Sequence, residues 1–238
     1  MDKKEIFEKA PVHKVVFSMA LPTILSMIVI ILYNMADTFF VGQTHNSLYV
    51  SAVSLASPVF LIFTAFSSMF GAGGSSVISR ALGTGEKEKA KRVSALVCYA
   101  SILFGIIMSA VVLLGMDFIL KILGTDESTY GYTKGYLTWI GIGAVFSIFS
   151  GAFSNIIRSE GASKDSMIGN ITGSVTNIIL DPILILALNM GVTGAAIATV
   201  TGNMVACIIY ASYFFRKETA LSIRLRDFHP TPRLIWEI

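Results

Sequence analysis

The feature that most constrains this chain is the apolar run from Val15 to Val41. It is long enough to cross a bilayer, since about 20 mainly apolar residues suffice. Near its far end the run carries one carboxylate, Asp37, preceded by Tyr33 and Asn34. Ionisable groups at membrane depth are costly, so they usually face a cavity or a partner on an ion or substrate path. Asp37 is therefore the first candidate functional residue.

The composition of the whole chain indicates the same class. Of 238 residues, 54% are hydrophobic and only 14% are charged, and the mean hydropathy is +0.71. A soluble domain of this size needs a charged exterior, so we expect an integral membrane protein. The net charge of +3 gives no reason to expect a nucleic-acid partner. Cys98 and Cys207 both lie in apolar stretches, which favours packing roles over a disulfide.

Six apolar stretches of membrane-spanning length follow one another along the chain. Their expected bounds are residues 15–41, 50–78, 93–115, 135–157, 167–188 and 195–215. They predict an all-α, six-transmembrane-helix bundle over residues 1–215, followed by a basic, irregular cytoplasmic linker over residues 216–238. The last residues, from Pro230 onward, resemble the start of the chain and predict the beginning of a seventh helix. Transporters are often built from two related membrane halves, so we expect this chain to be one half.

The basic residues are distributed asymmetrically about the expected spans. Of the 18 Lys and Arg residues, all but Lys121 and Lys134 fall on one side. Cytoplasmic segments carry an excess of Lys and Arg. The pattern therefore predicts a multi-pass protein of the cell membrane with both ends of this chain in the cytoplasm.

A second carboxylate, Asp181, lies in the fifth expected span, four residues after Asn177, as Asp37 lies four residues after Tyr33. Residues at this spacing share one helix face, and both acids are expected in the outer half of the membrane. Two buried carboxylates facing one cavity repel, and a proton or a Na⁺ between them relieves the repulsion. Ion occupancy can then bias a conformational equilibrium. Pro182 strengthens the hypothesis, because it leaves a backbone carbonyl one turn earlier without its helical donor.

Simpler interpretations of the same residues stay open. Asp37 could end its helix and reach interfacial water, and Asp181 with Pro182 could be a helix stop. Asn177 and Thr199 could make hydrogen bonds that serve only helix packing.

At these residues the sequence resembles the multidrug and toxic compound extrusion (MATE) transporters. The segments that carry the resemblance are ALPTILSMIVIILYNMADTFFVG, SRALGTGEKEKAKR, IIRSEGASKDSM, TNIILDPILI and GVTGAAIAT. They cover nearly the whole chain and correspond to the amino-terminal lobe of that family. The resemblance implies a twelve-helix, two-lobe transporter with a central cavity, which exports organic, often cationic, compounds in exchange for H⁺ or Na⁺.

The resemblance also implies roles for individual residues. Asp37 and Tyr33 match the first-helix members of an acidic network implicated in cation binding, Asn177 and Asp181 match the fifth-helix pair, and Thr199 matches a sixth-helix threonine. Asp37 and Asp181 are the possible Na⁺ ligands. The resemblance names no substrate-binding residue in this chain and no resident cofactor. The expected partners are a small organic substrate, the lipid bilayer and the carboxy-terminal lobe that the chain lacks.

Two other classes of function fit the sequence less well. A flippase for lipid-linked saccharides is the alternative within the same superfamily, but an anionic headgroup favours Arg or Lys in the cavity, and none lies inside the six expected spans. An intramembrane enzyme is not expected. The three histidines lie outside the spans, and neither a zinc-binding HExxH motif nor a Ser/His arrangement occurs within them.

Overall fold

The computed structural model describes residues 11–215, 219–228, 230, 234 and 237, and this part of the chain is helical without strands. Its elements are α2 (Val12–Gly42), α3 (Ser47–Gly83), α4 (Lys87–Leu114), α5 (Met116–Ile122), α6 (Glu127–Ile142), α7 (Ala144–Ser159), α8 (Ser163–Asp181), the π-helix η1 (Pro182–Ala187), α9 (Gly191–Tyr213) and the 3₁₀ helix η2 (Leu225–Asp227). Five helical stretches are long and apolar enough to cross a membrane, and the bent pair α6–α7 brings the number to six. The expected all-α membrane bundle is confirmed.

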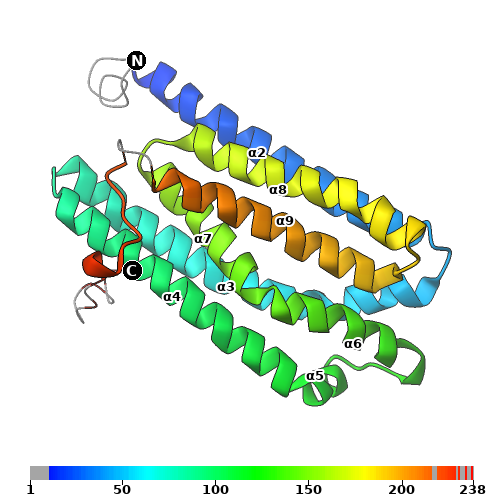
Figure 1. Cartoon of the computed structure of the whole chain (residues 1–238). Helices are drawn as coiled ribbons and strands as arrows, with labels where there is room; N and C mark the ends of the chain where they lie inside the picture. Colours follow the sequence, from blue (N-terminus) through cyan, green and yellow to red (C-terminus); the bar gives the residue numbers. More distant parts are fainter. Residues whose placement is uncertain (1–10, 216–218, 229, 231–233, 235–236, 238) are drawn as a thin grey trace.

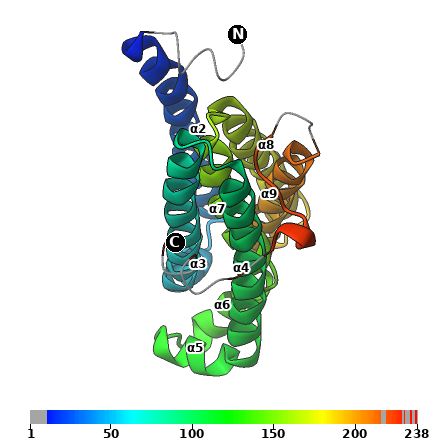
Figure 2. The same ribbon diagram turned by 90° about the vertical axis from the view of Figure 1, so that its left-hand side faces the viewer.

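The helices form a bundle with α7 at its centre, where α7 packs against α3, α4, α8 and α9. Ile148, Ala152, Phe153 and Ile156 of α7 are 0% exposed. By contrast, α2 lies at the edge and packs mainly against α8, and its first turns project beyond the neighbouring helices (Figure 2). The edge helix that carries Asp37 is thus attached to the bundle mostly through the helix that carries Asp181.

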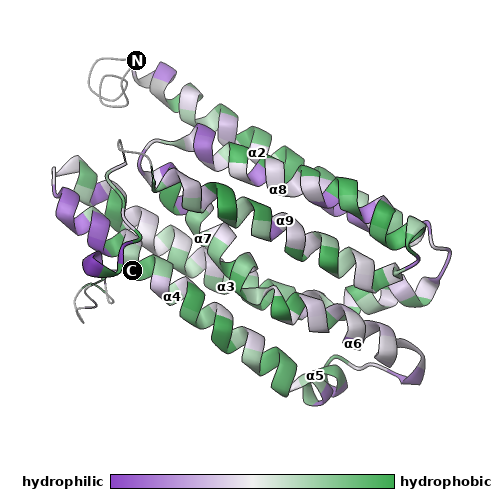
Figure 3. Cartoon of the chain, viewed as in Figure 1, coloured by the Kyte–Doolittle hydropathy of each residue, from purple (hydrophilic) through white to green (hydrophobic). Residues whose placement is uncertain are grey.

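Polar residues gather at the two ends of the bundle (Figure 3). The beginning of α2, the α3–α4 turn, the α7–α8 connection and the described residues after α9 share one end, whereas α5 lies at the other (Figure 1). Lys121 and Lys134, the two basic residues that the sequence placed apart from the rest, belong to α5 and α6 at that other end. Most of the expected seventh-helix start falls outside the described residues, of which Leu234 and Glu237 are helical.

The fourth expected span, residues 135–157, consists of two helices. The axes of α6 and α7 differ by 54° at a break next to Gly143. A Cβ atom at Gly143 would lie 2.2 Å from Val200 Cγ2 of α9, so the missing side chain lets α9 approach the break. The sequence has no proline at this point, and the bend was therefore not predicted.

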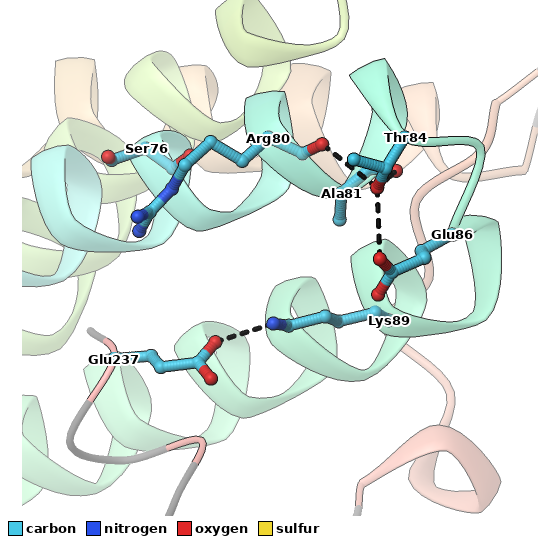
Figure 4. Close-up of polar contacts among 7 residues, drawn as sticks. All are labelled: Ser76, Arg80, Ala81, Thr84, Glu86, Lys89 and Glu237. Atoms are coloured by element: carbon cyan, nitrogen blue, oxygen red, sulfur yellow. Dashed lines mark hydrogen bonds and ion pairs between the residues drawn. The ribbon is translucent and has the colours of Figure 1, made fainter.

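The segment SRALGTGEKEKAKR lies between the second and third expected spans, yet it is mostly helical, since α3 and α4 leave only Thr84–Glu86 between them. Gly85 has a φ of +81°, a left-handed conformation that glycine adopts without steric cost. Thr84 Oγ1 donates to Glu86 Oε1 at 3.0 Å, and Lys89 Nζ lies 2.6 Å from Glu237 Oε2 (Figure 4). The residues after α9 therefore reach back to the start of α4.

Candidate functional site

The two acids that the sequence singled out lie near the same end of α2 and α8. Asp181 is the last residue of α8 and is 0% exposed, whereas Asp37 is half-buried. The Oδ1 atom of each carboxylate is buried and has no hydrogen-bond partner among the described residues. The carboxylates are close enough to interact electrostatically. Buried polar atoms normally have partners, so these two oxygens are exceptional among the described residues.

A close crossing of α8 and α9 positions the neighbours of Asp181. A Cβ atom at Gly173 would lie 2.8 Å from the Gly202 carbonyl oxygen, and one at Gly202 would lie 2.6 Å from the Gly173 carbonyl oxygen. Only glycine permits this approach, which agrees with the use of small residues at helix contacts in membranes. One turn beyond the crossing, Asn177 (2% exposed) of α8 faces Thr199 (8% exposed) of α9.

The Asn177 amide links the acid to α9. With its nitrogen toward Asp181, the amide donates to Oδ2 at 3.3 Å, and its oxygen accepts from the Thr199 N–H at 3.1 Å. In the opposite orientation the nitrogen donates to Thr199 Oγ1 at 3.3 Å and leaves the carboxylate facing the amide oxygen. The first orientation satisfies both ends of the amide, so we assign it. Asn177 therefore connects Asp181 of α8 to Thr199 of α9.

Two tyrosines complete the cluster, and the sequence pointed to only one of them. Tyr33 lies within electrostatic range of Asp37 and Asp181, and buried Tyr136 of α6 lies within range of both acids and of Tyr33. Tyr136 lies near the start of the expected fourth span, where an interfacial position was a sufficient explanation. The signal that could have found it is a partly polar stripe at helical spacing, with Thr129, Thr133, Tyr136 and Ile140 all buried.

A cavity of about 340 Å³ lies beside this cluster, between α2, α3, α7, α8 and α9. Tyr33, Asn177 and Thr199 line it, whereas the carboxylates lie one turn further along α2 and α8. The remaining polar lining consists of Asn34, Thr64, Ser67, Ser147, Ser150, Asn170, Ser174 and Asn203. Phe60 and Phe63 of α3 contribute aromatic surface to the cavity. Phe66 and Phe70, which follow on the same helix, pack against Phe104 of α4 instead. Among the described residues, the lining includes no charged side chain.

The helix continues beyond Asp181, which rules out the helix-stop interpretation. At Pro182 the backbone widens into the π-helix η1, and the Leu188 N–H donates to the Ile183 carbonyl at 2.9 Å. A π-helical segment inside a longer helix frequently accompanies a functional site. Here it begins at the residue after the buried acid.

The side-chain oxygen atoms in this region belong to the two carboxylates, the Thr199 hydroxyl and the tyrosine hydroxyls. Hard cations prefer oxygen ligands. The described residues contain no group of three or more His, Cys, Asp or Glu side chains that could hold a metal ion. A bound Na⁺ would therefore depend on Asp37, Asp181 and neutral oxygens, and a proton needs only one of the carboxylates.

Comparison with known proteins agrees with this geometry. The profile of the MatE family matches residues 22–183. The chain belongs to the MatE family. Multidrug export protein MepA from Staphylococcus haemolyticus is 34% identical to this MatE chain over 98% of its length, as is MepA from Staphylococcus aureus. The alignment covers 51% of each relative, so the chain spans about half the length of the curated relatives it matches.

Solved MATE structures share the fold of this MatE chain. The crystal structure of MATE in the bent conformation superposes with a TM-score of 0.88 and 30% identity, over 99% of this chain and 52% of the other. The outward-facing conformation of a multidrug resistance MATE family transporter gives a TM-score of 0.88 and 31% identity, over 94% and 50%. The predicted resemblance to a half-length MATE lobe is confirmed.

Proposed function

We propose that this chain is the amino-terminal lobe of a cation-coupled antiporter that exports organic, cationic compounds in exchange for H⁺ or Na⁺. The observation that carries the proposal is the pair of buried carboxylates, Asp37 and Asp181, whose unpartnered oxygens lie one turn beyond an uncharged polar cavity. The working transporter pairs this lobe with a second one, in keeping with relatives of twice the length.

The mechanism follows from the repulsion between the two acids. When both are charged, the α2 and α8 ends that carry them repel, and a proton or Na⁺ removes this repulsion. Tyr33 and Asn177 each line the cavity and lie one turn from an acid. An ion bound at the acids therefore changes the surroundings of two side chains that an exported compound contacts. A ligand shifts a conformational equilibrium only through different affinities for the two states, and the acid pair supplies such a difference.

The proposed location is the cell membrane, with the end that carries most basic residues in the cytoplasm. The α3–α4 turn, the α7–α8 connection and the described residues after α9 share that end (Figure 1). The positive-inside rule assigns such an end to the cytoplasm. Export then runs toward the end where Asp37 and Asp181 lie, so the coupling ion enters from outside.

The cavity lining favours export of organic cations over flipping of an anionic lipid-linked saccharide. Phosphate groups call for Arg or Lys, and the described lining residues include neither. Arg158 is a basic residue on α7, one of the helices that line the cavity. It is half-buried, and its Nη2 donates to Ser154 Oγ at 3.5 Å, but it does not line the cavity. Transport of cationic dyes, compared with lipid-linked saccharides in vesicles, tests this assignment.

The proposal is tested by Asp37→Asn and Asp181→Asn in the full-length protein. Each change removes one charge and keeps the side-chain shape. We therefore expect dye efflux driven by an imposed Na⁺ or H⁺ gradient to fall by about 10- to 100-fold, a factor that corresponds to common coupling free energies. The matched control is Asp117→Asn, because this exposed carboxylate binds Lys134 and Tyr130 outside the cluster. Normal efflux by either cluster variant would refute the mechanism.

A further inference from the structure

The residues after α9 form a strap, residues 219–228, that lies along the first turns of α4. Ser94 Oγ donates to the Ser222 carbonyl and accepts from the Ser222 N–H, both at 2.9 Å. Further along, the Tyr99 hydroxyl donates to the Ile223 carbonyl at 3.0 Å, and the Tyr99 ring meets Phe228 edge-on at 5.0 Å. The strap is therefore docked on the bundle at a defined height.

That height corresponds to the boundary between hydrocarbon and headgroups. With 28 residues, α4 is about 42 Å long at 1.5 Å per residue, whereas the hydrocarbon core measures about 30 Å. The excess length includes the polar first turns, Lys87–Arg92, which belong in the headgroup layer. Ser94 is two residues beyond these turns and Tyr99 is about two turns beyond them, so the strap that they hold lies where the headgroup layer meets the hydrocarbon core.

The strap, the start of α4 and the residues just after α9 enclose a basic hollow of about 690 Å³. Its basic lining residues are Lys91, Arg92, Arg224 and Arg226, and its acidic ones are Glu88 and Asp227. Lys91 pairs with Glu88 at 2.7 Å. Asp227 accepts from Ser222 Oγ at 2.5 Å and keeps its negative charge, so the four basic side chains still outnumber the two acidic ones.

The other three cations form a free positive surface. Arg92, Arg224 and Arg226 are exposed and make no ion pair within the described part of the chain. Apolar side chains accompany them, since Leu225, between two of the arginines, is 70% exposed and Phe215 is 83% exposed. Positive charge beside exposed apolar side chains matches the boundary of an anionic leaflet.

We propose that the basic hollow binds the phosphate headgroup of an anionic glycerophospholipid. Arg92, Arg224 and Arg226 supply the charge complementarity, and Leu225 and Phe215 contact the adjacent acyl chains. The depth of the strap and its exposed apolar side chains select a lipid over free phosphate, which has no apolar part. The site depends on neither the acid pair nor the coupling ion. In the proposed orientation it faces the cytoplasmic leaflet.

The test uses the whole protein in nanodiscs of phosphatidylcholine that contain spin-labelled phosphatidylglycerol. Electron paramagnetic resonance measures how strongly the anionic lipid is held at the protein surface relative to labelled phosphatidylcholine. In the triple variant Arg92→Gln/Arg224→Gln/Arg226→Gln we expect this preference to fall by about fivefold for each arginine removed, from the usual contribution of a basic residue near an anionic surface. Replacement of the same three arginines by lysine should keep most of the preference.

The matched control removes three other basic residues from the same end of the bundle. Arg80→Gln/Lys87→Gln/Lys164→Gln loses the same charge, but none of these residues lines the hollow. An unchanged preference in the first triple variant would overturn the proposal, as would an equal loss in both. If the first variant unfolds, the wild-type protein decides the question. Its preference should be lost at about 1 M salt, where the Debye length is about 3 Å, and should survive millimolar inorganic phosphate. Persistence at high salt, or loss to phosphate, would contradict a lipid site held by charge.

Discussion

At the scale of single residues, the geometry of the acid cluster depends on Gly173 as much as on the acids. The backbones of α8 and α9 touch where Gly173 faces Gly202, and this contact determines how closely Asn177 approaches Thr199 one turn later. Any added side chain has to push against backbone atoms, which cannot rotate away. The carboxylate of Asp181 would then lose its link to α9.

Gly173→Ala should therefore destabilise the protein although alanine favours helices. The new Cβ would lie 2.8 Å from the Gly202 carbonyl oxygen, and overpacking of this kind costs about 1–3 kcal/mol. The control is Gly131→Ala in α6, where a Cβ meets nothing within 4 Å and the change should stabilise by about 0.5–1 kcal/mol. Thermal unfolding of both purified variants provides the comparison. Equal stability of the two would show that the crossing is not tight.

The acids could be predicted from the sequence, because a carboxylate inside an apolar membrane helix costs free energy and is usually retained for a function. Asp37 and Asp181 stood out for that reason, and the four-residue spacing identified Tyr33 and Asn177 as their neighbours. Tyr136 could not be found in this way. Tyrosine is common at the membrane–water boundary, so its position near the start of a span gave no sign that Tyr136 lies near the acids.

At the scale of elements, the long helices were predictable and their breaks were not. The thickness of the membrane sets a minimum length for a spanning apolar helix, and apolar runs of that length can be recognised directly in the sequence. The 54° bend at Gly143 depends on the shape of α9 beside it, and the early start of α6 depends on a local cap. Asp126 Oδ1 accepts from the Thr129 N–H at 2.9 Å, while Thr129 Oγ1 accepts from the Asp126 N–H at 3.2 Å. This capping box satisfies donors that a helix start leaves free.

The cap predicts a pH-dependent contribution to stability. The hydrogen bond from the Thr129 side chain, followed by those from Ser128 and the Thr129 backbone, lowers the pKa of Asp126 from 3.8 to about 2. Because the pKa is lower in the folded state, the cap contributes fully above pH 4 and its contribution is lost as the pH falls toward 2. Asp126→Ala should accordingly lower the Tm at pH 7, and the difference from wild type should shrink toward pH 2.

The neighbouring variant Glu127→Ala is the control for this experiment, because it removes a carboxylate at the same place without breaking the capping box. At pH 7 its Tm should lie closer to that of the wild type than the Tm of Asp126→Ala does. A deficit of Asp126→Ala that stays constant down to pH 2 would mean that the charge of Asp126 does not contribute to the cap.

At the scale of the whole molecule, the acid pair bridges the boundary between the edge helix α2 and the rest of the bundle. Asp37 belongs to α2, whereas Asp181, Asn177 and Thr199 belong to α8 and α9, and α2 packs mainly against α8. In the proposed mechanism, a cation held between the carboxylates joins α2 to α8. Removal of that cation leaves two like charges across the α2–α8 contact, through which most of α2 is attached. Occupancy of the site should appear as stability of the entire protein.

A bound cation stabilises the folded state by about 2.7 kcal/mol when its concentration is 100 times its Kd. Thermal unfolding at constant ionic strength, with Na⁺ replaced by N-methylglucamine and repeated from pH 8 to pH 5, then separates the two coupling ions. A Na⁺ site raises the Tm with Na⁺ at fixed pH, whereas a proton site raises it only as the pH falls. Either rise should vanish in Asp37→Asn and persist in Asp117→Asn, because only Asp37 belongs to the buried pair. A wild-type Tm that responds to neither ion would mean that the two carboxylates do not form the coupling site, even though they lie close together.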